Sequence, residues 1–178
     1  IMVGEIRDLA TAEMAVQASL TGHLVLSTLH TNDAPSAVTR LLDLGVPHFL
    51  LQGTLAGVVA QRLVRKLCHH CKQPADVDTV KWKALTDGFG FPAPTQLMAP
   101  VGCSECRRTG YLGRTAIYEM MPVTQRPRGL LSKDLELPKF RAAALADGMR
   151  PLRLSAAEQV AKGVTTLDEV LAALPPGE

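Results

Sequence analysis

The first part of the chain alternates between short apolar runs and longer segments in which apolar residues recur at helical spacing. Residues 1–4 form an apolar run of the kind found in buried parallel strands, and residues 24–29 form a second one. Between the two runs, Asp8 is suited to cap a helix that extends to about Leu20. This order of strand, helix and strand is typical of an open, mostly parallel α/β sheet, which is the fold class we predict.

Two more helices are predicted after the second apolar run. Asp33 and Pro35 mark the start of a helix that closes at Gly45, and Pro47 opens another that ends near Gln61. Ligands of such sheets bind beyond the carboxyl ends of the strands, so the polar residues that follow each strand are candidate site residues.

The pattern changes at residue 68. Between residues 68 and 113, glycine and proline are frequent and apolar periodicity is weak. This predicts a small loop-rich module that needs a cross-link to be stable. Residues 114–121 then predict a strand that returns to the main body, and the remaining residues are predicted to be helical. The expected helix boundaries are Pro138 to Gly148, Pro151 to Gly163, and a last helix that begins at a capping box at 166–169 and stops at residues 175–177.

The composition indicates a folded chain with no membrane span. Apolar residues make up 47% of the 178 residues, which is enough for a substantial core. Nineteen basic residues against 17 acidic ones leave a net charge of +2, which is no signal for a polyanionic partner. The most continuous apolar stretch, residues 49–60, is shorter than the about 20 residues that a spanning helix needs. Any membrane association is therefore expected to come through a partner.

The chain opens directly inside a predicted strand, and position 1 is Ile rather than Met. Native N-termini rarely begin in a core strand, and no leader segment precedes it. We therefore expect the chain to be the C-terminal part of a longer protein that shares its function with residues outside this sequence.

All four cysteines fall in two Cys-x-x-Cys pairs, Cys68 with Cys71 and Cys103 with Cys106. Each such turn presents two thiolates to one ion, and two turns complete a tetrahedral zinc site. Disulfides are disfavoured because no secretory signal is present. Two separate redox motifs would lack the thioredoxin-like surroundings that such motifs usually have. The pattern therefore favours one zinc ion.

Two histidines, His69 and His70, lie inside the first pair and could replace one thiolate. Both sit within a tight turn, which makes this alternative less favourable. The segment between the pairs offers no carboxylate placed to activate water beside an open ligand position. We therefore expect a structural rather than a catalytic metal.

A carboxylate and a histidine stand at the ends of the two predicted strands. An apolar strand that ends in a carboxylate, as at Glu5, is what a nucleotidase needs to hold hydrated Mg²⁺ opposite a phosphate loop, but such acids are common and capping by Asp8 explains part of the same pattern. His30 ends the second strand, where it could contact a γ-phosphate or simply hydrogen-bond a loop. The residues by themselves leave both interpretations open.

Three segments together carry a family resemblance: Gly-Glu-Ile-Arg-Asp at 4–8, the run at 15–33, and Ala-Gln-Arg-Leu-Val-Arg-Lys-Leu-Cys at 60–68. They resemble the secretion ATPase superfamily of type II secretion and type IV pilus assembly. The resemblance continues through 110–119 and 163–170, and so extends from residue 1 to about residue 174. The paired cysteines resemble the tetracysteine module of the secretion and pilus-extension members, which retraction-type members generally lack.

The resemblance implies specific roles. The first segment resembles the family's Walker B segment, which would make Glu5 the acid that organises Mg²⁺ and its waters. The second resembles the histidine box, with His30 near the γ-phosphate and His23 as a second histidine. The implied cofactors are ATP, Mg²⁺ and Zn²⁺. The implied zinc ligands are Cys68, Cys71, Cys103 and Cys106.

The chain departs from the family pattern in two ways. Ala10 stands where the family usually has an acid, which puts a helix-start or subunit-contact role of that position in doubt. No Gly-x-x-x-x-Gly-Lys-[Ser/Thr] phosphate loop occurs in the sequence, and the acidic and arginine-bearing segments that the family places before Walker B are absent. We therefore expect this chain alone to be inactive.

The implied architecture is a partial RecA-like P-loop NTPase domain with an inserted zinc-binding module and a C-terminal helical bundle. The expected domains are residues 1–66, 67–113 and 114–178. The implied function is that of a hexameric cytoplasmic ATPase that couples ATP hydrolysis to pseudopilus or pilus assembly and to protein secretion across the bacterial envelope. The implied partners are further copies of the protein, an inner-membrane platform and cytoplasmic docking proteins, through which it would associate peripherally with the inner membrane.

A zinc-bearing interaction or nucleic-acid-binding module without ATPase activity is the alternative. Basic residues at 61–66 and 107–108 flank the cysteine pairs and would supply its surface. The near-neutral total charge and the lack of aromatic residues around the cysteines disfavour nucleic acid, since single-strand binding usually relies on stacking.

Overall fold

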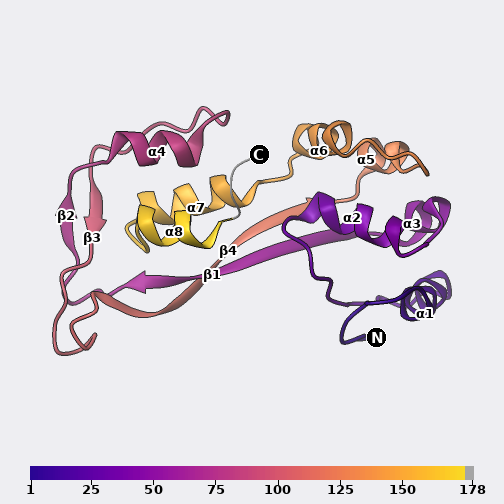
Figure 1. The fold of residues 1–178 in the computed structure, drawn as a ribbon, viewed down its shortest axis with the longest axis horizontal. Helices are drawn as coiled ribbons and strands as arrows, with labels where there is room; N and C mark the ends of the chain where they lie inside the picture. The colour runs from indigo at the N-terminus through magenta and orange to yellow at the C-terminus, as the bar shows by residue number, and fades with distance from the viewer. Residues whose placement is uncertain (175–178) are drawn as a thin grey trace. The chain divides into compact units, whose positions relative to one another are not determined.

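The computed structural model describes residues 1–174, which form two compact α/β units (Figure 1). The first unit comprises residues 1–60 and 120–149, and the second comprises residues 61–119 and 150–174. The three sequence-based domains divide the chain differently and stay a prediction. Within the described residues, no helix has both the length and the apolar character needed to cross a membrane.

In the first unit, the two predicted N-terminal strands pair in parallel. Met2 and Leu26 form a parallel bridge, the Val3 N–H donates to the Leu26 carbonyl at 2.8 Å, and the Ile6 N–H donates to the Thr28 carbonyl at 3.0 Å. The predicted strand direction is thus confirmed, although the pairing is short.

The prediction that these strands are buried is wrong for this chain. Met2 is 84% exposed and Leu24 is 73% exposed. Two paired segments cannot enclose their own side chains, because both faces of a sheet need a covering layer to become a core. The apolar character of the two runs therefore correctly predicted strand formation but not burial.

The two helices next to these strands begin where the sequence predicts. Helix α1 (Leu9–Leu20) is capped by Asp8, whose side chain accepts a hydrogen bond from the Thr11 N–H. Helix α2 (Ala34–Asp43) is capped in the same way by Asp33, with Pro35 in its first turn. Both helices are thus positioned by the polar residues that follow the strands.

The predicted helix from Pro47 to Gln61 ends earlier than expected. Helix α3 covers only His48–Thr54, and strand β1 (Gly57–Leu67) begins three residues later. At Gly57 a Cβ atom would lie 3.1 Å from the Met121 carbonyl oxygen, so the backbone of the next strand runs close by. Pairing with that strand overrides the helical pattern here.

Strand β4 (Tyr111–Pro122) confirms the predicted return strand and pairs with β1. The two strands run antiparallel, because the Val123 N–H donates to the Ala56 carbonyl at one end and the Cys68 N–H donates to the Gly110 carbonyl at the other.

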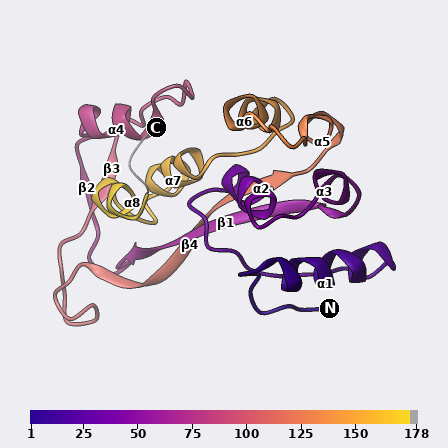
Figure 2. The same cartoon turned by 45° about the vertical axis from the view of Figure 1, so that its right-hand side comes forward.

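Helices α5 (Gln125–Leu130) and α6 (Leu137–Ala146) lie side by side and complete the first unit (Figures 1 and 2). Phe140 on α6 is fully buried and belongs to one apolar cluster with residues of α1, α2 and the end of β4. The cluster consists of Ala12, Val16, Ala34, Val38, Leu41, Val46, Leu51, Met121, Val123, Leu131, Phe140, Ala144 and Met149.

The second unit contains more regular structure than its loop-rich sequence predicts. Strands β2 (Gln73–Ala75) and β3 (Leu97–Ala99) pair antiparallel, and helix α4 (Thr79–Thr86) lies between them in the chain. Helix α4 contacts the C-terminal helices α7 (Leu152–Ala161) and α8 (Leu167–Ala173). The module therefore gains its core from these helices rather than building one of its own.

The capping box predicted for α8 forms only in part. Thr166 accepts from the Glu169 N–H, but the Glu169 carboxylate instead accepts three hydrogen bonds from Arg65 of β1, two from the guanidinium and one from the backbone N–H. The Arg65 guanidinium also lies 4.3 Å from the centre of the Tyr111 ring. Its hydrogen bonds hold the pKa of Glu169 below the usual value. The predicted stop at 175–177 lies outside the described residues.

Replacing Phe140 with Ala tests the core of the first unit. The ring is 0% exposed, so we expect the free energy of unfolding to fall by about 3–5 kcal/mol through loss of burial and creation of a cavity. Phe49, which is 60% exposed, provides the matched control, and Phe49→Ala should cost less than about 1 kcal/mol. Urea denaturation measures both values. Equal costs would contradict the assigned core.

Candidate functional site

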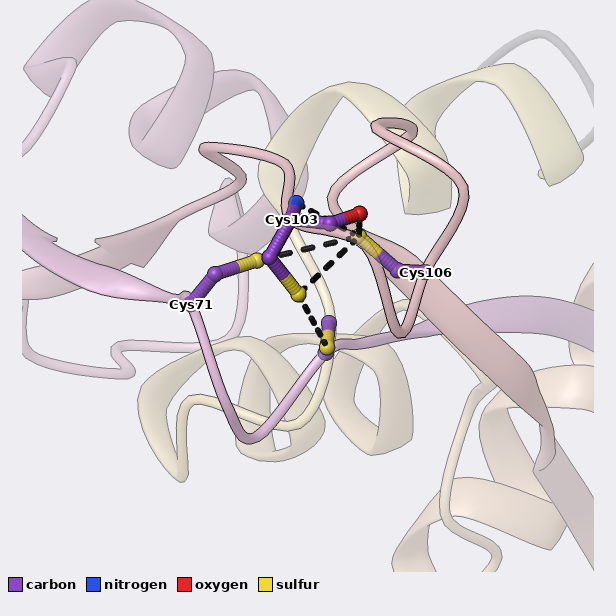
Figure 3. A group of neighbouring side chains, drawn as sticks. Cys71, Cys103 and Cys106 are labelled. Carbon is purple, nitrogen blue, oxygen red and sulfur yellow. Dashed lines mark hydrogen bonds between the residues drawn. The ribbon is translucent and has the colours of Figure 1, made fainter.

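The four cysteines converge in the second unit. Figure 3 shows three of them, Cys71, Cys103 and Cys106, with their side chains close together. All four sulfur atoms lie within 4.8 Å of one another. The Sγ–Sγ distances are 3.9 Å for Cys68 and Cys103, and 3.8 Å both for Cys71 with Cys106 and for Cys103 with Cys106. Tetrahedral zinc with Zn–S bonds of about 2.3 Å implies sulfur separations of about 3.8 Å. The donor set and its spacing therefore fit a zinc ion.

The first cysteine pair is held by the end of β1. Cys68 directly follows the last residue of the strand and donates its N–H to the Gly110 carbonyl at 2.9 Å. The Lys72 N–H closes the turn on the Cys68 carbonyl, and the Lys72 ammonium donates to the Gly163 carbonyl at 2.7 Å. The turn is thus attached both to the residue just before β4 and to the segment between α7 and α8.

The second pair lies in a tight turn that needs glycine at both ends. At Gly110 (φ +76°) a Cβ atom would lie 2.4 Å from Pro100 Cβ, and at Gly102 (φ +109°) it would lie 2.7 Å from the Arg108 carbonyl oxygen. Arg107 and Arg108 also have positive φ angles, +52° and +62°, which side-chain-bearing residues rarely adopt. This backbone conformation brings Cys103 and Cys106 together.

Backbone N–H groups point at two of the sulfur atoms. Gly102 donates to Cys71, while Cys103 and Gly110 donate to Cys106, each at 3.2 Å. The N–H groups of Cys103 and Gly110 lower the pKa of Cys106 to about 6, whereas burial outweighs the Gly102 donor and raises the pKa of Cys71 to about 11. Donors that face sulfur favour the thiolate, which is the form that binds metal.

The two histidines of the first turn lie outside the cluster that could hold a metal. The group within ligand distance consists of the four cysteines, and both His69 and His70 are exposed. Their rings contact each other with centroids 3.8 Å apart and planes tilted by 40°. The geometry therefore favours the four thiols over a mixed set with histidine.

A second polar group forms in the first unit. The Glu5 carboxylate accepts from the Arg7 guanidinium at 2.6 Å and contacts His30 Nε2 at 3.0 Å. The hydrogen bond from Arg7 is the main reason that the pKa of Glu5 lies below its usual value. The parallel pairing places Glu5 and His30 at the same end of the two extended segments, as expected from the sequence.

These side chains border an open hollow of roughly 470 Å³ that is lined by Glu5, Ile6, Arg7, His30 and Arg40. Arg40 comes from the last turn of α2 and was not among the residues predicted from the sequence. In the sequence, Arg40 could have been noted as a basic residue on the helix that follows His30. Only the fold shows that Arg40 lines the hollow. Two arginines and a histidine supply donors suited to an anionic ligand.

His23 does not join this group. Its Nδ1 lies 3.1 Å from Thr21 Oγ1 and 3.2 Å from the Ala18 carbonyl, at the end of α1. His23 precedes the second extended segment, whereas His30 follows it, so the two histidines stand at opposite ends. Ala10 lies exposed in the first turn of α1, which begins at its Asp8 cap without an acid at that position.

Comparisons with known proteins show the family to which the chain belongs. The family model described as "Type II/IV secretion system protein" matches residues 1–172. The chain is 54% identical over 175 residues to the type IV pilus assembly ATPase TfpB of Acinetobacter baylyi, covering 98% of this chain and 30% of that protein. It is 50% identical over 171 residues to the type II secretion system protein HxcR of Pseudomonas aeruginosa, covering 96% and 32%.

Solved structures show the same fold. The pilus retraction motor PilT with bound ADP matches with a TM-score of 0.63 and 25% identity, over 99% of this chain and 39% of that one. The ATPase DotB of Legionella pneumophila matches with a TM-score of 0.60 and 20% identity, over 97% and 37%, which supports the fold alone. The chain thus has the α/β fold of these ATPases. It belongs to the type II/IV secretion system protein family, and it spans about a third of the length of the curated relatives named above.

Gly110→Ala tests the second cysteine turn, with Gly88→Ala as its matched control. Both glycines have φ near +80° (+76° and +81°), so alanine costs about 1 kcal/mol at either position for the left-handed backbone. Only at Gly110 does the new Cβ meet another atom, since nothing lies within 4 Å of the one at Gly88. We expect Gly110→Ala to destabilise the chain more and to speed alkylation of Cys106. Equal alkylation rates in the two variants would argue against the tight turn.

Proposed function

We propose that the chain is part of a hexameric ATPase that couples ATP hydrolysis to pseudopilus or pilus assembly and to protein secretion across the bacterial envelope. The convergence of Glu5, Arg7 and His30 around one hollow is the observation that carries the proposal. Family membership adds to it, because TfpB is named as a type IV pilus assembly ATPase and HxcR as a type II secretion system protein.

In this proposal Glu5 is the Walker B acid and would hold Mg²⁺ through its waters. Arg7 keeps the carboxylate ionised, which is the state that this role requires. His30 contacts Glu5 from the neighbouring segment, and so would stand close to the γ-phosphate of bound ATP. Bound Mg²⁺ would supply charge neutralisation at the phosphates. His23 remains in the proposal as a second histidine of the box, at a place apart from Glu5.

Phosphate binding in this class of ATPase depends on a glycine-rich loop and its lysine. The chain contains no Gly-x-x-x-x-Gly-Lys-[Ser/Thr] sequence. We therefore propose that the chain supplies only part of a RecA-like nucleotide site, and that alone it hydrolyses little or no ATP. The loop would come from other residues of the intact protein.

The wider organisation belongs to the same proposal. Residues 1–66 would form the RecA-like part, 67–113 the zinc module, and 114–178 the return strand with a C-terminal helical bundle. The intact hexamer would act in the cytoplasm, bound peripherally to the inner membrane through a membrane platform and docking proteins.

For the metal site we propose one structural zinc ion per chain. The four thiol sulfurs have the spacing that tetrahedral zinc requires, and two backbone N–H groups favour the thiolate form of Cys106. The ion would join the turn after β1 to the turn before β4, and so close the loop formed by residues 72–102. Thiolate–zinc bonding can offset the entropy of closing such a loop several times over.

Glu5→Gln in the intact ATPase tests the nucleotide site. The substitution keeps the shape and removes the charge, so we expect hydrolysis to slow by about two orders of magnitude or more, with hexamer and fold unchanged. Glu13→Gln, at an exposed position of α1, is the control and should leave the rate unaltered. Steady-state phosphate release measures both. A near-normal rate for Glu5→Gln would refute the Walker B assignment.

Cys103→Ser tests the metal site. Loss of one of four thiolates should lower the zinc content of purified protein and increase proteolysis between residues 73 and 102, with much of the helical signal retained. Ser104→Ala, in the same turn and without a thiol, should keep both metal and resistance. Elemental analysis and limited proteolysis provide the measurements. If the unaltered protein, purified without chelator, contains no zinc, the proposal is wrong.

A further inference from the structure

The N-terminus of α2 is tied to α6 by an ion pair. The Arg141 guanidinium on α6 donates to Asp33 Oδ2 at 2.6 Å, and the two side chains are 26% and 13% exposed. The other carboxylate oxygen of Asp33 accepts from the Ser36 N–H at 2.8 Å, which caps α2. One carboxylate therefore both begins the helix and connects it to a second helix.

Asp33 stands between two of the residues that line the hollow. His30 lies three positions before it, and Arg40 lies on the helix that it caps. Thr31 Oγ1 donates to the Asp33 carbonyl at 3.1 Å, which folds the segment from His30 to Asp33 into a short turn. Because the His30 side chain is 86% exposed, packing does little to fix it, and its place depends on this backbone and on the contact with Glu5.

The charge state and surroundings of Asp33 suit a fixed anchor. Burial alone would raise the pKa of Asp33, but hydrogen bonds from Ser36 and Arg141 lower it overall. The carboxylate is therefore ionised, and a charge-assisted bond at 2.6 Å between half-buried groups is stronger than a typical surface pair. Phe140, next to Arg141 on α6, lies in the same apolar cluster as Val38 of α2. Helices α2 and α6 therefore also pack against each other through apolar side chains.

We propose that Arg141 is a positioning residue for the nucleotide site: through Asp33 it holds the N-terminus of α2 and thereby sets the place of His30 and Arg40 at the hollow. The inference rests on the proposed ATPase function. Arg141 acts on the structure of the site rather than on the nucleotide.

Two substitutions in the intact protein separate this role from simple stability. Arg141→Met keeps the aliphatic stem and removes the charge, while Asp33→Asn keeps a good helix cap and weakens the ion pair. We expect each to lower kcat about tenfold with KM for ATP changed less than threefold, because a small misplacement of reacting groups costs rate. The double variant should be no slower than the slower single variant, since one interaction is removed.

Lys139→Met is the control for loss of a basic residue on α6. Lys139 is exposed and pairs with Glu136 of the same segment. The kcat of Lys139→Met should therefore stay within about twofold of that of the unaltered protein. A kcat for Arg141→Met that matches the control would overturn the proposal, as would single losses that multiply in the double variant. If Arg141→Met does not fold, Asp33→Asn decides by the same tenfold criterion.

A second readout does not depend on catalysis. The imidazole resonance of His30, followed by selective isotope labelling in the nucleotide-free intact protein, should shift in Arg141→Met and stay in place in Lys139→Met. An unshifted resonance in Arg141→Met would overturn the positioning role. If the unaltered protein hydrolyses no ATP, the proposed function fails, while the His30 resonance still decides whether Arg141 positions this residue.

Discussion

The arrangement of the first unit depends on backbone pairing between two short parallel segments. The hydrogen bonds at Val3 and Ile6 align the ends of these segments, and this alignment brings Glu5 within 3.0 Å of His30. Residues 25 positions apart in the chain thereby share one carboxylate–imidazole contact. A shift of the pairing by one residue would turn Glu5 away from His30, since side chains alternate along an extended segment.

The cysteine cluster follows a different constraint, which is steric rather than a matter of register. Gly102 and Gly110 allow backbone to pass where a Cβ atom would collide, and Arg107 and Arg108 accept an unfavourable conformation between them. Strain of this kind persists where surrounding contacts over-determine the chain. Here those contacts include the hydrogen bonds from backbone N–H groups to sulfur, so the turn and its donor set stabilise each other.

The sequence allowed much of this to be predicted where local chemistry decides the outcome. Asp8 and Asp33 correctly predicted helix starts, and the cysteine spacing correctly predicted that four sulfurs meet. Non-local contacts account for what the sequence did not show. The end of α3 depends on β4 passing beside Gly57, and the place of Arg40 at the hollow depends on how α2 packs. Glu169 matched the pattern of a capping box, but its carboxylate instead accepts hydrogen bonds from Arg65, 104 positions away in the chain.

Both units are discontinuous in sequence, and this affects how the chain can fold as it is synthesised. The first unit needs residues 120–149 to complete the core around Phe140, and the second needs residues 150–174 to cover α4. The first unit can therefore close only once residue 149 has been synthesised, and the second only once the residues after 150 have followed. Until then the side of the cluster on α2 that packs against α6 stays uncovered, a state prone to aggregation. Metal binding by the cysteine turns does not cover this cluster, because the four cysteines belong to the second unit. Folding of these residues therefore depends on a late collapse that joins segments far apart in the sequence.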